Sequence, residues 1–531
     1  MTIVWNAQRV SEGLAEIDSA RGVVLANIKK LLDEYHGVEK STRFYDILLG
    51  DWVERYLHLV YVASQYSTLD ERQVQIEPAK VDTREFDIFG DSAEFFSRYP
   101  DLPLMVTSAI KSVVLDGPQG VRISDSVITV RNHFTSSRLD RLLSRTLRIV
   151  ASKNPKSVLF VKPISGKVSI SWVATMFSWR RWASHDDLGF SFSSTLRPNL
   201  VWRKKNIRPI SGNSNLSEVA LSILPIFIPI CFVEAFESLK NQINEARPKR
   251  FEHVYSAQAL WTHFAFKVLV AEWCEQGTKL HYHQHGGWYG LDETHVGELY
   301  ESRVADHYYT WGWSRGNGKS SPLSPVTRNV DKATKIYDSL ICFDQPQQIY
   351  RLQYFPLPGT LQTMYDQTAE FVRARASKTE LRIRLFPGEY GSQQRDAILR
   401  ANSGAKFDNS LEIFSQYARS RIVFHSYLGT SWLETLGNNI PTICFYDVDA
   451  YRFRTDAKAL LEDLVKVGIL HLSGSSAAEK ANAVEGDLDL WWMSEEVQTA
   501  RRNFVNQYAN FSSDWKEIWR EHFTNVLKTN R

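Results

Sequence analysis

The feature that most constrains the fold is a regular alternation of short apolar segments with helical segments, which occurs in two series. The first series runs from Val158 to Trp311 and the second from Ser339 to Tyr446, with a Ser-, Gly- and Pro-rich stretch at 314–334 between them. Strands that alternate with helices form parallel sheets. At 531 residues the chain is too long for one hydrophobic core. The sequence therefore predicts two doubly wound α/β domains with a cleft between them.

The predicted domains have unequal lengths. We expect an N-terminal domain over residues 1–320, on the acceptor side, and a C-terminal nucleotide-sugar domain over 335–490. Residues 11–67 have apolar side chains at helical spacing and form a helical extension of the first domain. The tail, residues 491–531, is helical and rich in aromatic residues, and we predict that it packs across both domains.

Charge is distributed unevenly along the chain. The formal net charge is only +3, but residues 141–208 contain 14 Lys or Arg against two Asp. This surplus favours an anionic partner, and we expect an anionic membrane surface or an acidic glycan there. The stretch contains no recognised nucleic-acid-binding module, so we predict no nucleic-acid partner.

The longest apolar run, residues 219–233, is shorter than the ~20 residues that a membrane-spanning helix needs. Two prolines interrupt it, so we predict a buried strand or loop. The N-terminus has no basic-then-apolar leader pattern, and the four cysteines lack metal-ligand spacing. The expected location is the cytoplasm, with peripheral contact at the inner membrane as an option.

Three histidines occur at every second position of a predicted strand: His281, His283 and His285. They share one face of the strand, but three imidazoles in a row seldom close a tetrahedral metal site. We assign His281 and His283 to the strand and predict no metal. His285 lies where the strand ends and two glycines begin, and glycine lets the backbone approach a ligand closely. His285 is therefore a candidate general acid or base.

Two acidic residues of the following helix, Glu298 and Glu301, are three positions apart and share a helix face. We expect Glu301 to belong to a solvated face. Glu298 is the candidate for orienting His285 or for binding a hydroxyl group of the acceptor.

Asp344 directly follows a predicted buried strand at 339–343. A carboxylate at that place lies at the carboxyl edge of a parallel sheet, where ligands bind. It can serve as a nucleophile or a base, or it can cap the next helix, and from the residues alone we favour the cap.

The strongest candidate for a phosphate site is the strand–turn–helix pattern at 421–436. Thr430 and Ser431 stand at the start of the helix, where hydroxyl and backbone N–H groups suit a phosphate. Glu434 either completes a capping box with Ser431 or holds a ribose hydroxyl. Arg384 is a second candidate phosphate ligand, unless its strand is a solvated edge. The chain has no Walker loop, Gly-x-Gly-x-x-Gly or Gly-x-Ser-x-Gly motif.

Taken together, these motifs resemble a bacterial family of surface-polysaccharide transferases with the GT-B fold. The resemblance is carried by residues 284–290, 298–313, 384–391 and 430–441, with an early match at 48–52. That family is distantly similar to the retaining CMP-Kdo transferases of capsule and lipopolysaccharide synthesis. The resemblance implies a CMP-activated 3-deoxy-ulosonic or nonulosonic acid donor and a surface-glycan acceptor, lipid-linked or free. It also implies a reaction that needs no metal or other cofactor.

The resemblance further implies roles for individual residues. Asp344 corresponds to the carboxylate thought to attack the anomeric carbon, and His285 occupies the acid/base position. The related enzymes have a His-Pro pair where this chain has Phe386-Pro387, so phosphate binding passes to the other candidates. The implied site comprises Asp344, His285 and Glu298 for catalysis, Gln345, Arg384, Pro387, Tyr390, Thr430, Ser431 and Glu434 for the donor, and Gln284, Gly286, Gly287 and Tyr289 for the acceptor.

Two alternatives stay open at this level. One is a GT-B transferase that uses a nucleoside diphosphate sugar or a CDP-polyol. The other is a noncatalytic scaffold or binding subunit of polysaccharide assembly, which would not need both His285 and Asp344. The sugar, the linkage and the oligomeric state are not specified by the sequence.

Overall fold

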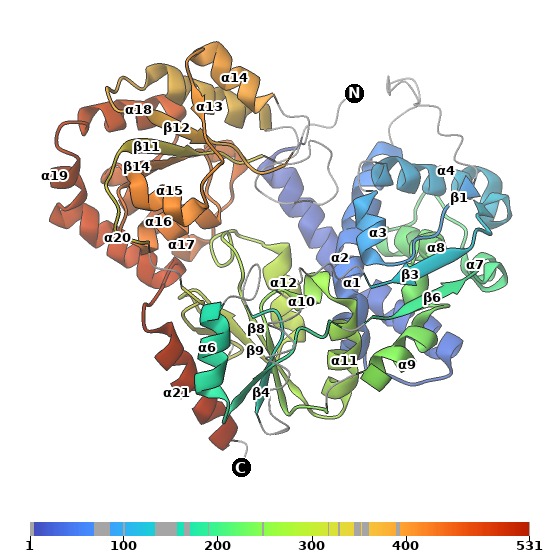
Figure 1. Cartoon of the computed structure of the whole chain (residues 1–531). Helices are drawn as coiled ribbons and strands as arrows, with labels where there is room; N and C mark the ends of the chain where they lie inside the picture. The colour runs from blue at the N-terminus through green and yellow to red at the C-terminus, as the bar shows by residue number, and fades with distance from the viewer. Residues whose placement is uncertain are drawn as a thin grey trace.

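A computed structural model describes residues 5–67, 85–98, 101–132, 157–163, 170–189, 191–246, 249–316, 318–327, 330–344, 352, 361–388 and 393–529. Gln345 and Tyr390 of the predicted site lie outside these ranges, as do the basic residues from Arg141 to Lys156. Figure 1 shows the second α/β unit at upper left, the first at lower centre and the N-terminal helices beside it.

Two long helices begin the described chain, α1 (Ala7–His36) and α2 (Thr42–Ser67). Apolar residues at helical spacing bury one face of α1, which confirms the helical prediction for residues 11–67. Arg21 of α1 pairs with Asp46 and Glu54 of α2 inside the interface. These buried charges are matched, as burial requires.

Shorter elements complete the N-terminal region. They are β1 (Glu85–Phe86), α3 (Ser92–Ser97), α4 (Leu102–Gly120), β2 (Arg122–Ile123), β3 (Ile128–Arg131), β6 (Ser193–Leu196), α7 (Leu200–Asn206), α8 (Leu216–Phe227), the 3-10 helix η1 (Ile230–Phe232) and α9 (Phe236–Ala246).

The apolar run at 219–233 forms most of α8 and the turn η1, so the prediction of a strand or loop was wrong. A capping box between Asn215 and Glu218 starts the helix, and Pro225 lies in its last turn. The run is apolar on every side because α8 packs among α1, α2 and α4. Within the described ranges, no helix is both long enough and apolar enough to cross a membrane.

The first sheet has six parallel strands in the order β10-β9-β8-β7-β4-β5. Its strands are β4 (Val158–Phe160), β5 (Ala183–His185), β7 (His253–Ser256), β8 (Lys279–His283), β9 (His307–Thr310) and β10 (Ser320–Pro322). Its helices are α6 (Ile170–Trp179), α10 (Ala259–Thr262), α11 (Phe264–Glu275) and α12 (Val296–Val304). Strand β10 lies inside the stretch 314–334, which we expected to be a linker throughout.

The second sheet also has six parallel strands, in the order β13-β12-β11-β14-β15-β16. Its strands are β11 (Tyr337–Ile341), β12 (Leu381–Arg384), β13 (Lys406–Phe407), β14 (Ser420–His425), β15 (Thr442–Phe445) and β16 (Leu470–His471). Its helices are α13 (Leu361–Ala374), α14 (Gln394–Ala401), α15 (Ile413–Arg419), α16 (Thr430–Gly437), the 3-10 helix η2 (Val448–Ala450), α17 (Thr455–Lys466) and α18 (Gly474–Ala483). The strand order reverses between β11 and β14, which is the position where open α/β sheets bind ligands.

Three helices end the chain: α19 (Leu488–Trp492), α20 (Glu495–Tyr508) and α21 (Trp515–Thr529). Helix α20 packs on α16 and α17 of the second unit. Helix α21 returns to the first unit (Figure 1). There Trp519 and Phe523 pack against Phe160 of β4 and Tyr255 of β7. The prediction that the tail packs across both α/β units is confirmed.

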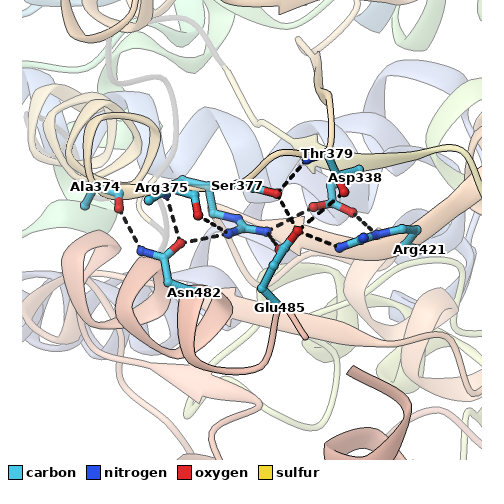
Figure 2. Close-up of polar contacts among 9 residues, drawn as sticks. Asp338, Ala374, Arg375, Ser377, Thr379, Arg421, Asn482 and Glu485 are labelled. Atoms are coloured by element: carbon cyan, nitrogen blue, oxygen red, sulfur yellow. Dashed lines mark hydrogen bonds and ion pairs between the residues drawn. The ribbon is translucent and has the colours of Figure 1, made fainter. Parts of the chain in front are cut away.

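An ionic network joins α13 and α18 to the amino-terminal end of the second sheet. Figure 2 shows Arg375 between the carboxylates of Glu485 and Asp338, with Arg421 bound to the same two carboxylates. Asn482 accepts from Arg375 at 2.7 Å. This network lies at the opposite end of the strands from the ligand-binding edge, and we assign it to stability.

Candidate active site at the domain junction

The loop that follows β8 lies directly against the second α/β unit. Gly287 N–H donates to Thr430 Oγ1 at 2.9 Å, and a Cβ on Gly287 would lie 2.6 Å from the Gly429 carbonyl group. Further along the loop, Glu293 N donates to Arg452 O and Arg454 N donates to Leu291 O, each at 2.9 Å. The glycine pair was expected to admit a ligand. At Gly287 the missing side chain instead allows the backbone of the second unit to approach closely.

An aromatic cluster continues this contact to the ends of three strands of the second sheet. Trp288 packs on Phe343, after β11, and on Tyr427, after β14. Phe343 also contacts Phe386, after β12. Trp288 has φ 68°, an unusual conformation for a bulky residue, which is held by these contacts. The carboxyl ends of β8, β11, β12 and β14 therefore meet at one place.

His285 lies at the start of this loop, two residues beyond His283, the last residue of β8. Its side chain is 26% exposed, while its Nδ1 lies 3.3 Å from Oε1 of the buried Glu301 of α12. Tyr289 donates to the same Oε1 at 2.9 Å. One edge of the imidazole thus faces a buried carboxylate while the side chain keeps access to solvent.

Glu301 is fully buried, so the expectation of a solvated helix face was wrong. Trp261 Nε1 donates to its Oε1 at 2.6 Å, and Tyr308 OH donates to its Oε2 at 2.9 Å. Burial raises the pKa of Glu301 to about 8, although the hydrogen bonds from Trp261, Tyr289 and Tyr308 act to lower it. The i, i+3 spacing predicts that Glu298 and Glu301 share a face of the helix. It does not predict that this face is buried.

Glu298 does not orient His285, which was one of its two predicted roles; its binding of a hydroxyl group of the acceptor stays a prediction. Its Oε2 accepts from Gly290 N at 2.8 Å, and its other oxygen pairs with Arg315. Glu298 therefore fixes the end of the glycine-containing loop, one turn of α12 away from the carboxylate that contacts His285.

Gln284 was predicted to bind the acceptor, but it is buried and its side chain is used within the protein. Its Oε1 accepts from Trp311 N at 3.0 Å and from Trp313 Nε1 at 2.9 Å, and its Nε2 donates to Gly286 O at 2.9 Å. Tyr289, also predicted for the acceptor, is buried against Glu301. Gln284 and Tyr289 thus hold the loop after β8 in place through hydrogen bonds inside the first unit.

His281 and His283 belong to β8, as predicted. His281 Nδ1 contacts Tyr309 OH at 2.7 Å, and its Nε2 contacts His253 at 3.0 Å. His283 Nδ1 contacts Tyr255 OH at 2.6 Å. The three histidines of the motif thus have separate partners. The described part of the chain contains no group of three or more His, Cys, Asp or Glu side chains placed to hold a metal ion.

Asp344 follows β11 at the point where the strand order of the second sheet reverses. Its carboxylate is buried, and Oδ1 accepts from Tyr365 OH of α13 at 2.6 Å. This hydrogen bond fixes one oxygen of the carboxylate. The residues after it, 345–350, lie outside the described ranges, so the alternative of a helix cap stays a prediction.

The start of α16 is arranged differently from the predicted phosphate site. Ser431 is buried and its Oγ contacts Tyr427 OH at 3.0 Å and His425 Nδ1 at 3.2 Å. Thr430 Oγ1 accepts from Gly287 of the other unit. Both hydroxyls thus have protein partners: the partner of Thr430 lies in the loop after β8, and the partners of Ser431 lie at the end of β14 and just after it.

Glu434 does not form a capping box with Ser431. Gly429 is the cap residue of α16, and Glu434 Oε2 accepts from Tyr417 OH at 3.1 Å. The alternative role on a ribose hydroxyl stays a prediction.

Arg384 also has protein partners: it donates to Leu411 O at 2.6 Å and to Gln416 Oε1 at 3.2 Å. Its strand lies inside the sheet, between β13 and β11, so the alternative of a solvated edge was wrong. Pro387 is exposed just beyond this strand. In the basic stretch, Arg203 is fully buried and pairs with Glu234 at 2.7 Å, so it cannot face an anionic surface.

The fold and the junction define a two-domain α/β protein of GT-B type. Two doubly wound units meet at the carboxyl ends of their strands, and a C-terminal helix returns to the first unit. Comparison with family models places the chain more narrowly. The model of the "LIC12162 family transferase" matches residues 2–523, so the chain belongs to this transferase family. Membership in a family of transferases disfavours the noncatalytic subunit.

Comparison with curated proteins finds no match. Among solved structures, the wall teichoic acid polymerase TagF is 10% identical with a TM-score of 0.35, over 74% of this chain and 94% of that one. MnaA of S. aureus with UDP is 10% identical with a TM-score of 0.40, over 70% and 97%. HepE of Anabaena with UDP and glucose is 12% identical with a TM-score of 0.38, over 70% and 99%.

Proposed function

We propose that this transferase is a glycosyltransferase that adds a sugar to a bacterial surface glycan. The observation that carries the proposal is the meeting of the His285 loop with the strand end that bears Asp344, through the contact of Trp288 with Phe343. In transfer at an anomeric carbon, an imidazole with solvent access can act as the general base and an oriented carboxylate can act as the nucleophile. The family membership supports group transfer, and the resemblance of the motifs supports a sugar.

In the proposed reaction Asp344 is the nucleophile and the configuration of the sugar is retained. A carboxylate oxygen of Asp344 bonds to the anomeric carbon while the bond from that carbon to the nucleotide phosphate breaks, and the phosphate keeps the electron pair. The acceptor hydroxyl then gives its proton to His285 as its oxygen bonds to the same carbon. The bond to Asp344 breaks in this second step and restores the carboxylate.

We further propose a CMP-activated ulosonic or nonulosonic acid as the donor. Residues 284–290 and 430–441 resemble the surface-polysaccharide transferases, and that family is distantly similar to the CMP-Kdo transferases. CMP carries a single phosphate, which hydrogen-bond donors can hold without a metal ion. The donor phosphate has to be held by groups other than the Ser431 hydroxyl, which is buried among Tyr427 and His425. An acceptor glycan carried by a membrane lipid would suit the remaining basic residues at 141–208.

Ligand binding tests the donor. Calorimetric titration and thermal shift with CMP, CDP, UDP and GDP, in buffer with EDTA, should give binding and a higher melting temperature with CMP alone. Selective binding of UDP, GDP or CDP would replace the donor by a nucleoside diphosphate sugar or a CDP-polyol. A requirement for a divalent ion would contradict the metal-free proposal.

Turnover measurements test the proposed catalytic roles of Asp344 and His285. With the donor that binds, Asp344→Asn and His285→Ala should each lower kcat by about 10²–10⁴-fold while leaving nucleotide affinity within a few-fold. Asp396→Asn, at an exposed position of α14, is the matched control and should behave as the parent protein. Unchanged turnover in both variants would overturn the assignment of the site.

A further inference from the structure

Glu301, for which the sequence predicted no functional role, has a carboxylate that is held by several hydrogen bonds next to His285. Its carboxylate is fully buried and receives hydrogen bonds from three side chains that belong to three different segments. They are Trp261 of α10, Tyr289 of the loop after β8, and Tyr308 of β9. Two of these donors meet at Oε1, the oxygen that lies 3.3 Å from His285 Nδ1.

The groups around Glu301 favour one arrangement of hydrogens. Trp261 can only donate, and both tyrosine hydroxyls are placed to donate to the carboxylate. Burial and, to a smaller extent, the charge of Glu301 raise the pKa of the buried phenols of Tyr282 and Tyr300. Tyr289 OH, which donates to Glu301 Oε1, also lies 3.4 Å from His285 Nδ1, so both oxygens that face Nδ1 are placed to accept from it. Nδ1 of His285 is therefore the nitrogen that carries the hydrogen in the neutral ring, and Nε2 is the nitrogen with the lone pair.

We propose that Glu301 is a positioning residue for His285: it fixes the Nδ1–H tautomer and raises the affinity of Nε2 for a proton. This inference rests on the proposed function for the reaction itself, but the contact between the two residues does not. When the acceptor hydroxyl gives its proton to Nε2, the Nδ1 hydrogen moves toward Glu301 and the buried negative charge is neutralised. No further reactant is needed, and the proton leaves through Nε2 when the enzyme resets.

Burial supplies the driving force for this coupling. An ionised carboxylate without solvent costs free energy, and the pKa of Glu301 is raised to about 8 for this reason. A proton that arrives at Nε2 relieves that cost. With Glu301 ionised and the imidazole neutral, the pair holds one proton, at Nδ1, and is ready to act as a base. With a second proton bound, the pair is ready to act as an acid.

The first test is made on the unchanged protein and needs no substrate. The chain has 14 histidines, so ¹⁵N-histidine labelling is practical, and comparison with His285→Gln assigns the His285 signals. At pH 9–10 the ¹⁵N shifts should show a hydrogen on Nδ1 and a lone pair on Nε2. The Nε2–H tautomer at that pH would overturn the proposal whatever reaction the protein catalyses.

The second test compares two variants of α12. In Glu301→Gln the buried charge is absent, so the His285 signals should titrate at lower pH than in the parent. In Glu298→Gln, a buried carboxylate on the same helix, they should titrate as in the parent. If Glu301→Gln does not fold, the His285 tautomer measured in the parent protein still tests the inference. A parent-like titration in a folded Glu301→Gln protein would contradict the inference.

Turnover separates this inference from the proposed function. If the function holds, Glu301→Gln lowers kcat by roughly tenfold or more and moves the acid limb of the pH–rate profile to lower pH. Glu301→Asp, which keeps the charge, should restore part of the rate. If His285→Ala leaves turnover unchanged, the function assigned to His285 falls while the histidine titration stands. If His285→Ala is inactive but Glu301→Gln equals the parent in rate and pH profile, only this inference falls.

Discussion

Three polar side chains that follow one another along the loop and α12 have different surroundings: Gln284, His285 and Glu301. Gln284 is buried: its Oε1 accepts from two tryptophan N–H groups and its Nε2 donates to a backbone carbonyl group, so the side chain is used within the protein. His285 keeps 26% of its side chain exposed. Glu301 is buried behind it. At this scale the hydrogen-bond partners, and not the residue types, decide which group can meet a substrate.

The role of Gln284 leads to a stability prediction. Gln284→Leu removes the acceptor of Trp311 N–H and Trp313 Nε1–H, and each buried donor left without a partner costs about 1–3 kcal/mol. The urea midpoint should fall clearly, while Gln119→Leu, at an exposed position, should not change it. Full stability of Gln284→Leu with weaker acceptor binding would restore the original assignment to the acceptor site.

At the scale of elements, the last helix packs in the core of the first unit, although it follows the second unit in the sequence. Trp519 of α21 is fully buried, stacks near Phe160 of β4 and donates to Ser324 O at 2.7 Å. Its removal should therefore weaken a sheet whose strand β4 lies more than 300 positions earlier in the sequence.

Trp519→Ala should lower the free energy of unfolding of the first unit by about 3–5 kcal/mol, the usual cost of removing a large buried aromatic side chain. Chemical denaturation followed by tryptophan fluorescence measures it. Ile518→Ala, next in sequence but 37% exposed, is the control and should change it little. Equal effects of the two substitutions would contradict the docking of α21.

The ionic network of the second unit predicts a dependence of stability on pH. Burial acts to raise the pKa of Glu485, but hydrogen bonds from Arg375 and Ser377 and the charges of Arg375 and Arg421 outweigh it and lower the pKa to about 2. The folded-state pKa thus lies below the ordinary value of 4.5. The stabilisation is present above about pH 4.5 and is lost as the pH falls toward 2.

Glu485→Gln should lower stability by about 1 kcal/mol at pH 7, less than the full pKa difference implies, because solvent screens part of this pair. The difference from the parent protein should vanish between about pH 4.5 and pH 2. Urea midpoints across this range measure it, with the exposed Glu496→Gln as the control. A difference that persists at pH 2 would show that packing, not charge, explains it.

At the scale of the whole molecule, the two units are joined by backbone contact at the site itself. Gly287→Ala would place a methyl group 2.6 Å from the Gly429 carbonyl group, so the loop that carries His285 has to move away. We expect faster hydrogen exchange at 285–293 and a turnover at least tenfold lower, which corresponds to about 1.4 kcal/mol.

Gly286→Ala is the matched control for this prediction. The nearest atom to its new Cβ would be Thr430 Oγ1 at 3.5 Å, an ordinary contact distance. Its amide groups at 285–293 should exchange as those of the parent protein do. If the two variants behave alike, the close approach of the units does not control the His285 loop.

The sequence by itself determined the two parallel-sheet units, the helical N-terminus, the aromatic tail and the place of His285 and Asp344 just beyond their strands. These features depend on local periodicity and on the residue at which a strand ends, both of which are visible along the chain. Only the tertiary structure decided that Glu301, and not Glu298, lies against His285, and that Gly287 and Thr430 bind each other. Those facts depend on which side of a helix is buried and on contacts between residues 143 positions apart. Spacing along the chain contains no information about either.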